Sequence, residues 1–162
     1  MKFAKVRDVK SPERGTSKSA GIDFFIPNDF PTITLGAGCD LLIPSGIKMD
    51  VSEGYMLMAA EKSGVVTSRE AAIRAGRTLK QGAFSSVVIL GAKIVDEDYQ
   101  GEIHIHLINV GQYGIVITPG MKIAQFILVP VSYESLEEVP ENQLFEKTSS
   151  RGEGGFGSTG NR

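Results

Sequence analysis

The chain has 162 residues, a formal net charge of −2 and 41% hydrophobic residues, which fits one domain with a real core and argues against a general nucleic-acid-binding surface. Cys39 is the only cysteine, so an internal disulfide and a cysteine zinc site are excluded. No apolar run reaches the length of a membrane span and the first ten residues lack the apolar block of a signal peptide, so we expect a soluble cytoplasmic protein with no membrane partner.

Short strand-like runs dominate the chain. They are rich in Ile, Val and Leu, are separated by Gly, Pro, Asn or Asp, and cover 41–51, 54–60, 86–95, 102–110 and 115–131. Ile103, Ile105 and Leu107 alternate with polar residues, which predicts a strand with one buried face. Pro119-Gly120 predicts a turn. We therefore predict an all-β fold, an antiparallel sandwich or barrel.

One segment has a helical pattern instead. Residues 67–80 start with a capping box, Thr67 with Glu70, and carry a basic face, which predicts an inserted surface helix or, as the alternative, a ligand-binding one. After Val131 the chain becomes acidic and weakly apolar. We expect a β domain over 1–135 and a C-terminal arm over 136–162.

The arm ends in RGEGGFGSTG, residues 151–160. Such a glycine-rich stretch is typical of a mobile tail. The alternative is a strap that a ligand orders, with backbone N–H groups and Arg151 on phosphate and Phe156 stacked on a planar base.

Two other clusters could carry chemistry. Asp96, Glu97 and Asp98 follow a strand, and we place them at a hairpin bend with Glu97 on the face opposite its two neighbours. A carboxylate there could act as general base on water or hold a water of a Mg²⁺ ion, and an ordinary polar turn is the alternative. The other cluster is Lys62-Ser63-Gly64, which could hold phosphate but does not match P-loop spacing.

Metal ligation by histidine is not favoured. His104 and His106 form H-x-H on a strand, but they are the only two histidines, and a zinc site needs further ligands. No G-x-S-x-G turn indicates a serine nucleophile.

Taken in order, five segments resemble the motifs of the trimeric dUTP pyrophosphatase (dUTPase) family: AGIDF (20–24), EKSG (61–64), KIVDEDYQGEI (93–103), GMKIAQFI (120–127) and RGEGGFGSTG (151–160). The resemblance implies a compact antiparallel β-barrel or jelly-roll-like subunit of a homotrimer with a flexible C-terminal tail. The one inserted helix expected over 67–80 departs from it, because the stretch between Gly64 and Gly91 is longer than is usual in the family. The resemblance also implies Mg²⁺-dependent hydrolysis of dUTP to dUMP and diphosphate, which limits uracil in DNA and supplies dUMP for dTMP synthesis.

The resemblance further implies roles for single residues. Asp96 would deprotonate the water that attacks the α-phosphorus, and Tyr99 would pack on the deoxyribose. Uracil would pair with the backbone of Lys93, Ile94 and Val95 and, across the hairpin, with His104. The remaining implied contacts are Asp23 to the metal waters, phosphate contacts from Lys62, Ser63, Gly64, Gln125 and Arg151, and closure over the base by Phe156 and Gly157.

The chain departs from the family pattern at several positions. Lys62 stands where arginine is usual, Met121-Lys122 replace an Asp-Arg pair, and Lys93 replaces a small residue, often glycine, which puts base selectivity in question. Two alternatives stay open: a relative of dCTP deaminase, and a regulatory protein whose inserted helix contacts an unidentified macromolecular partner. Direct nucleic-acid binding is not expected.

Overall fold

A computed structural model of the protein describes residues 1–62, 88–147, 149–150 and 152. It divides the chain into two units, Met1–Ser132 and Tyr133–Arg162. The expected helix over 67–80 lies outside the described residues, so it stays a prediction. In the second unit the described residues include one short 3₁₀ helix, η1 (Glu141–Gln143). No helix in the described part of the chain has the length and apolar character needed to cross a membrane.

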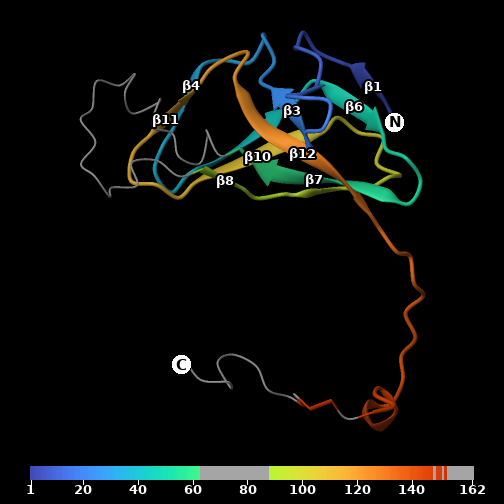
Figure 1. Ribbon diagram of the computed structural model, residues 1–162. Coiled ribbons are helices and arrows are strands. Elements are labelled where there is room, and N and C mark those ends of the chain that lie inside the picture. Colours follow the sequence, from blue (N-terminus) through green and yellow to red (C-terminus); the bar gives the residue numbers. More distant parts are fainter. Residues whose placement is uncertain (63–87, 148, 151, 153–162) are drawn as a thin grey trace. The chain divides into compact units, whose positions relative to one another are not determined.

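The first unit is built from short strands, which confirms the predicted all-β class (Figure 1). They are β1 (Lys2–Lys5), β2 (Glu13–Arg14), β3 (Gly21–Phe25), β4 (Ile33–Leu35), β5 (Asp40–Pro44), β6 (Ile47–Asp50), β7 (Tyr55–Glu61), β8 (Val88–Leu90), β9 (Ile94–Val95), β10 (His104–Asn109), β11 (Ile115–Ile117) and β12 (Lys122–Pro130).

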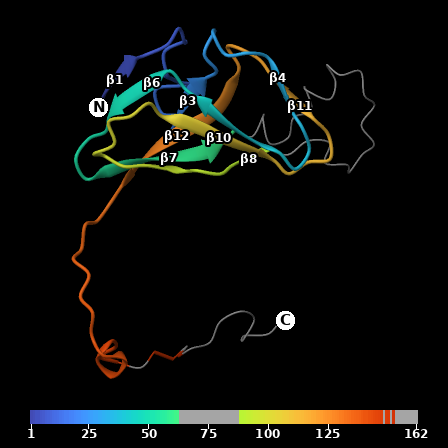
Figure 2. The ribbon, with the colours of Figure 1, turned by 180° about the vertical axis from the view of Figure 1, so that it is seen from behind.

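The described strands pair antiparallel in four sheets. The largest has the order β2-β3-β12-β7-β9, a second has β5-β10-β8, and β1-β6 and β11-β4 form two-stranded pairs. In both ribbon views the β1-β6 pair lies at one end of the first unit and the β4-β11 pair at the other (Figures 1 and 2). The turn at Pro119-Gly120 is confirmed, because Met121 N donates to Thr118 O at 3.3 Å and Gly120 has a φ of 73°.

The core packs the long strands of these sheets against one another. Every residue of β3 is buried, and its Phe24 ring lies 4.4 Å, centroid to centroid, from Phe126 of β12. The alternation predicted for β10 is confirmed, since Ile105 and Leu107 are buried while His104 is exposed and His106 half-buried. The buried positions of these strands fix their register, and the register fixes the positions of the polar side chains at the strand ends.

Candidate active site

The acidic segment lies in a long loop between β8 and β10, residues 91–103, which we call the acidic loop. The β8-β10 ladder places Leu90 opposite Leu107, and Gly91 N donates to His106 O at 2.9 Å. Beyond this point the chain leaves the ladder, and β9 pairs with β7, Val95 lying opposite Leu57. The expected bend at the acidic triplet is confirmed, since Tyr99 N donates to Asp96 O at 3.2 Å, but the strands on its two sides are not paired with each other: among the described strands β9 and β10 are not neighbours in any sheet.

The two arms of the acidic loop are held apart by different neighbours. On the first arm, Lys93 O accepts from Ala59 N of β7 at 2.6 Å. On the second arm, Ile103 N donates to Ile47 O at 2.9 Å and Ser45 N donates to Ile103 O at 3.0 Å. Because β9 is the edge strand of its sheet, one side of its backbone has no strand partner among the described residues.

The three acidic side chains of the loop differ in surroundings. Glu97 is half-buried, and its Oε2 accepts from Gly54 N, at the positive-φ turn before β7, at 2.5 Å. Asp96 and Asp98 are exposed. This agrees with the predicted alternation, and it leaves the Asp96 carboxylate facing solvent beside the open edge of β9.

Tyr99 and His104 meet at the backbone of Glu102. The Tyr99 hydroxyl donates to Glu102 O at 2.9 Å, and His104 Nδ1 lies 2.9 Å from the same oxygen, a contact that needs the proton on Nδ1. The Tyr99 ring crosses over Gly101, where an added Cβ would come within 2.3 Å of the hydroxyl. Gly101 therefore permits this placement of the ring.

The Glu102 side chain anchors the second arm, a role that the sequence did not indicate. Its Oε1 accepts from Arg7 Nε at 2.9 Å and from Gly46 N at 2.7 Å. The hydrogen bond to Glu102 raises the pKa of Arg7 above its ordinary value. In the sequence Glu102 lies within the segment KIVDEDYQGEI, which resembles a family motif, but nothing there indicates Arg7 or Gly46 as its partners.

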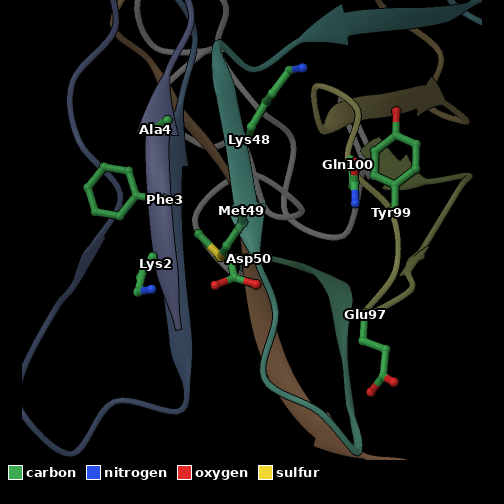
Figure 3. A pocket seen from close by; sticks show the side chains of 9 residues that line it. All are labelled: Lys2, Phe3, Ala4, Lys48, Met49, Asp50, Glu97, Tyr99 and Gln100. Carbon is green, nitrogen blue, oxygen red and sulfur yellow. The ribbon is translucent and has the colours of Figure 1, made fainter.

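A hollow of about 420 Å³ adjoins the acidic loop. Figure 3 shows Glu97, Tyr99 and Gln100 from the loop on one side and residues of β1 and β6 on the other. Tyr99 is 44% exposed, so part of its surface is accessible to a ligand.

A second group of predicted site residues surrounds Asp23 in β3. Asp23 is 4% exposed; its Oδ1 accepts from Lys62 Nζ, and its Oδ2 accepts from Lys122 Nζ at 2.8 Å. Burial raises the pKa of Asp23, but the hydrogen bonds from Lys122 and Lys62 outweigh it and bring the pKa below the ordinary value. The same bond to Asp23 raises the pKa of Lys122. Lys62 and Lys122 are thus both charge partners of Asp23.

Gln125 of β12 belongs to this second group. It lies opposite Asp23 in the β12-β3 register, and its Nε2 donates to Glu61 O at 3.0 Å. Its side chain crosses Gly21, where an added Cβ would come within 2.0 Å of Gln125 Oε1. The structure therefore brings Asp23, Lys62 and Gln125 together around the end of β7.

The two groups lie at opposite ends of β7. Val95, next to Asp96, pairs with Leu57, whereas Lys62 follows the last residue of the strand. From Leu57 to Lys62 the chain spans about 17 Å at the ordinary rise of a strand. The predicted residues Ser63, Gly64, Arg151, Phe156 and Gly157 lie outside the described residues.

The described residues do not fit a metal ion held by the chain itself. Among them, no group of three or more His, Cys, Asp or Glu side chains is arranged to hold one. Both oxygens of Asp23 accept from lysine ammonium groups. A role for Asp23 on metal waters stays a prediction, since each carboxylate oxygen keeps a lone pair beyond its bond to a lysine.

Comparisons with known proteins agree with this fold. A model of the dUTPase family matches residues 7–160. A deoxyuridine 5'-triphosphate nucleotidohydrolase of Chlamydia muridarum is 32% identical, over 98% of this chain and 97% of its own. A dUTPase variant of Staphylococcus bacteriophage 80alpha with dUpNHpp has a TM-score of 0.76 at 22% identity, covering 98% of this chain and 97% of its own.

A dUTPase variant of phage phi11 of S. aureus, described with a structural Mg(II) ion, has a TM-score of 0.67 at 20% identity and covers 86% of this chain and 96% of its own. The phage structures share the antiparallel β fold with this protein. The chain belongs to the dUTPase family.

Proposed function

We propose that the protein is an enzyme that hydrolyses dUTP to dUMP and diphosphate. The observation that carries the proposal is the open acidic loop, whose two arms are bonded to β7 and to the β5-β6 corner. A planar pyrimidine would lie between such arms, against the backbone of Lys93, Ile94 and Val95. Ile94 presents its N–H and C=O at the open edge of β9, because Lys93 O is bonded to Ala59 N of β7 and bonded residues alternate along an antiparallel pair. Family membership supports the choice of dUTP.

The sugar and the reacting water are assigned to the same loop. Tyr99, held over Gly101 and next to His104, would pack against the deoxyribose beside the hollow in Figure 3. Glu97 is bonded to Gly54, so the exposed carboxylates of Asp96 and Asp98 are the ones available to a water, and of these two the family resemblance selects Asp96. It would take a proton from the water whose oxygen attacks the α-phosphorus, while the bond from that phosphorus to the bridging oxygen breaks and diphosphate leaves.

We assign the phosphate contacts to Lys62 and Gln125, together with Ser63, Gly64 and Arg151, which lie outside the described residues. Phe156 and Gly157, also outside them, are assigned to closure over the base. Lys62 would exchange Asp23 for phosphate oxygens, which an ammonium binds as a point charge. Mg²⁺ is expected on the triphosphate oxygens, and Asp23 is assigned to waters of the metal.

We further propose that each site is shared between subunits of a homotrimer. Asp96 and Lys62 lie at opposite ends of β7 in one chain, which suits a site that takes its water-activating residue and its phosphate-binding residues from different copies. The phosphate-binding residues of one subunit and the acidic loop of another would then come together only in the assembled trimer.

Product analysis tests the activity. With Mg²⁺ and dUTP we expect equimolar dUMP and diphosphate by ion chromatography, and little turnover of dCTP. Release of ammonia from dCTP would instead indicate a deaminase, and no reaction with either nucleotide would favour a binding protein without this activity.

A further inference from the structure

Glu61, the last residue of β7, has hydrogen bonds to β8, to β12 and to Lys93, the residue just before β9. Its Oε1 accepts from Lys93 Nζ at 2.8 Å and from Leu90 N at 3.2 Å, and its carbonyl oxygen accepts from Gln125 Nε2 at 3.0 Å. The hydrogen bond from Lys93 lowers the pKa of Glu61 although burial opposes it, so the carboxylate is charged at neutral pH. Glu61 therefore links the two groups of candidate site residues.

The ion pair between Glu61 and Lys93 lies on one face of the sheet that contains β7 and β9. Val95 lies directly opposite Leu57 and Ile94 opposite Met58, so alternation places Lys93 on the face of Val95 and Leu57. Glu61 shares this face, because it follows Leu57 and Ala59 at the period of a strand. Ile94 and Asp96 point to the other side.

A lysine at position 93 whose side chain was free to move would disturb the selection of the base. Its ammonium group is donor-only, on a flexible four-carbon chain. Uracil carries a donor at N3, where cytosine carries an acceptor. Backbone groups of fixed direction discriminate between these two edges, whereas a freely moving ammonium could donate to cytosine N3.

We propose that Glu61 is a positioning residue that holds Lys93 away from the edge of β9, so that pyrimidine selection rests on the backbone of that strand. This inference rests on the proposed dUTP hydrolysis. The Lys93 and Glu61 side chains are 44% and 29% exposed, so the pair is a partly solvated one that can be broken without unfolding the sheet.

The test compares kcat/KM for dUTP and for dCTP hydrolysis in wild type, Glu61→Gln, Lys93→Ala and the double variant. Glu61→Gln keeps a side-chain oxygen for Leu90 N and the backbone carbonyl for Gln125, and removes only the charge that holds Lys93. Glu53→Ala, at an exposed position just before β7, is the matched control. We expect the dUTP:dCTP ratio of Glu61→Gln to fall about fivefold, the factor that a partly exposed ion pair supports, chiefly through a lower KM for dCTP.

The double variant separates positioning from a merely structural role. In the double variant, which lacks the lysine, the dUTP:dCTP ratio of kcat/KM should return to that of Lys93→Ala. A structural defect caused by Glu61→Gln would persist in the double variant. If Glu61→Gln does not fold, the charge-swapped chain with Glu61→Lys and Lys93→Glu must show the wild-type ratio. An active wild type with an unchanged ratio in Glu61→Gln, or no recovery in the double variant, overturns the inference alone. A wild type that does not hydrolyse dUTP overturns the proposed function.

Discussion

The Asp23 carboxylate and the Lys122 ammonium form a 2.8 Å ion pair in which the Asp23 side chain is 6% exposed. Lys62 shares the same carboxylate. Removing one partner of a buried ion pair leaves the charge of the other partner uncompensated. This usually costs more stability than the intact pair contributes. Here both lysines keep part of their side chains in solvent, which reduces that effect.

Asp23→Asn is therefore expected to lower the free energy of unfolding by about 1–3 kcal/mol at neutral pH. Because the folded-state pKa of Asp23 is below its ordinary value, this contribution is fully present above about pH 4 and is lost as the pH falls through the folded-state pKa. Urea unfolding of wild type and variant across this range checks it, with exposed Asp29→Asn as control. A difference between wild type and Asp23→Asn that does not change with pH would contradict this account.

Gly101→Ala is expected to impair catalysis more than stability. A Cβ would come within 2.3 Å of the Tyr99 hydroxyl, and the ring can move away because it is 44% exposed. The loss of the Tyr99–Glu102 hydrogen bond should cost about 1 kcal/mol of unfolding free energy. The KM for dUTP should rise at least about tenfold if Tyr99 packs on the sugar, since each lost 1.4 kcal/mol of binding is tenfold.

Gly114→Ala provides the matched control for that experiment. An added Cβ there would meet Thr34 Cγ2 at 2.9 Å, in the β4-β11 region, so it tests crowding without touching the acidic loop. Equal rises in KM for both variants would mean that Tyr99 has no specific role.

Subunit mixing addresses the shared site. Asp96→Asn chains and chains that end at Ser150 are each expected to be nearly inactive. Refolded together, they should regain part of the activity, because some sites would receive Asp96 from one chain and the arm from another. Light scattering on the same samples gives the oligomeric state in which the activity is measured. A fully active monomer would rule out an active site shared between subunits.

Local patterns in the sequence predicted much of the first unit. The alternation at Ile105 and Leu107 and the turn at Pro119-Gly120 depend on neighbouring residues alone, and both are confirmed. The family match over residues 7–160 confirms the resemblance that the five motifs indicated.

The surroundings of the acidic loop could not be predicted in the same way. Pairing of β9 with β7, in place of a continued hairpin with β10, depends on contacts distant in sequence, such as Ala59 with Lys93. The ion pairs of Asp23 with Lys122 and of Glu61 with Lys93 depend on the same strand register. Charge alone does not reveal these partners.

The central claim is that Asp96 activates the attacking water, and the turnover of Asp96→Asn on dUTP tests it most directly. Asp98→Asn is the matched control, since Asp98 is also an exposed carboxylate of the acidic loop. An amide cannot accept the water's proton, so kcat of Asp96→Asn should fall about 10²–10⁴-fold while binding of a non-hydrolysable dUTP analogue is retained. Asp98→Asn should keep a kcat close to that of wild type. A wild-type kcat for Asp96→Asn would contradict the account.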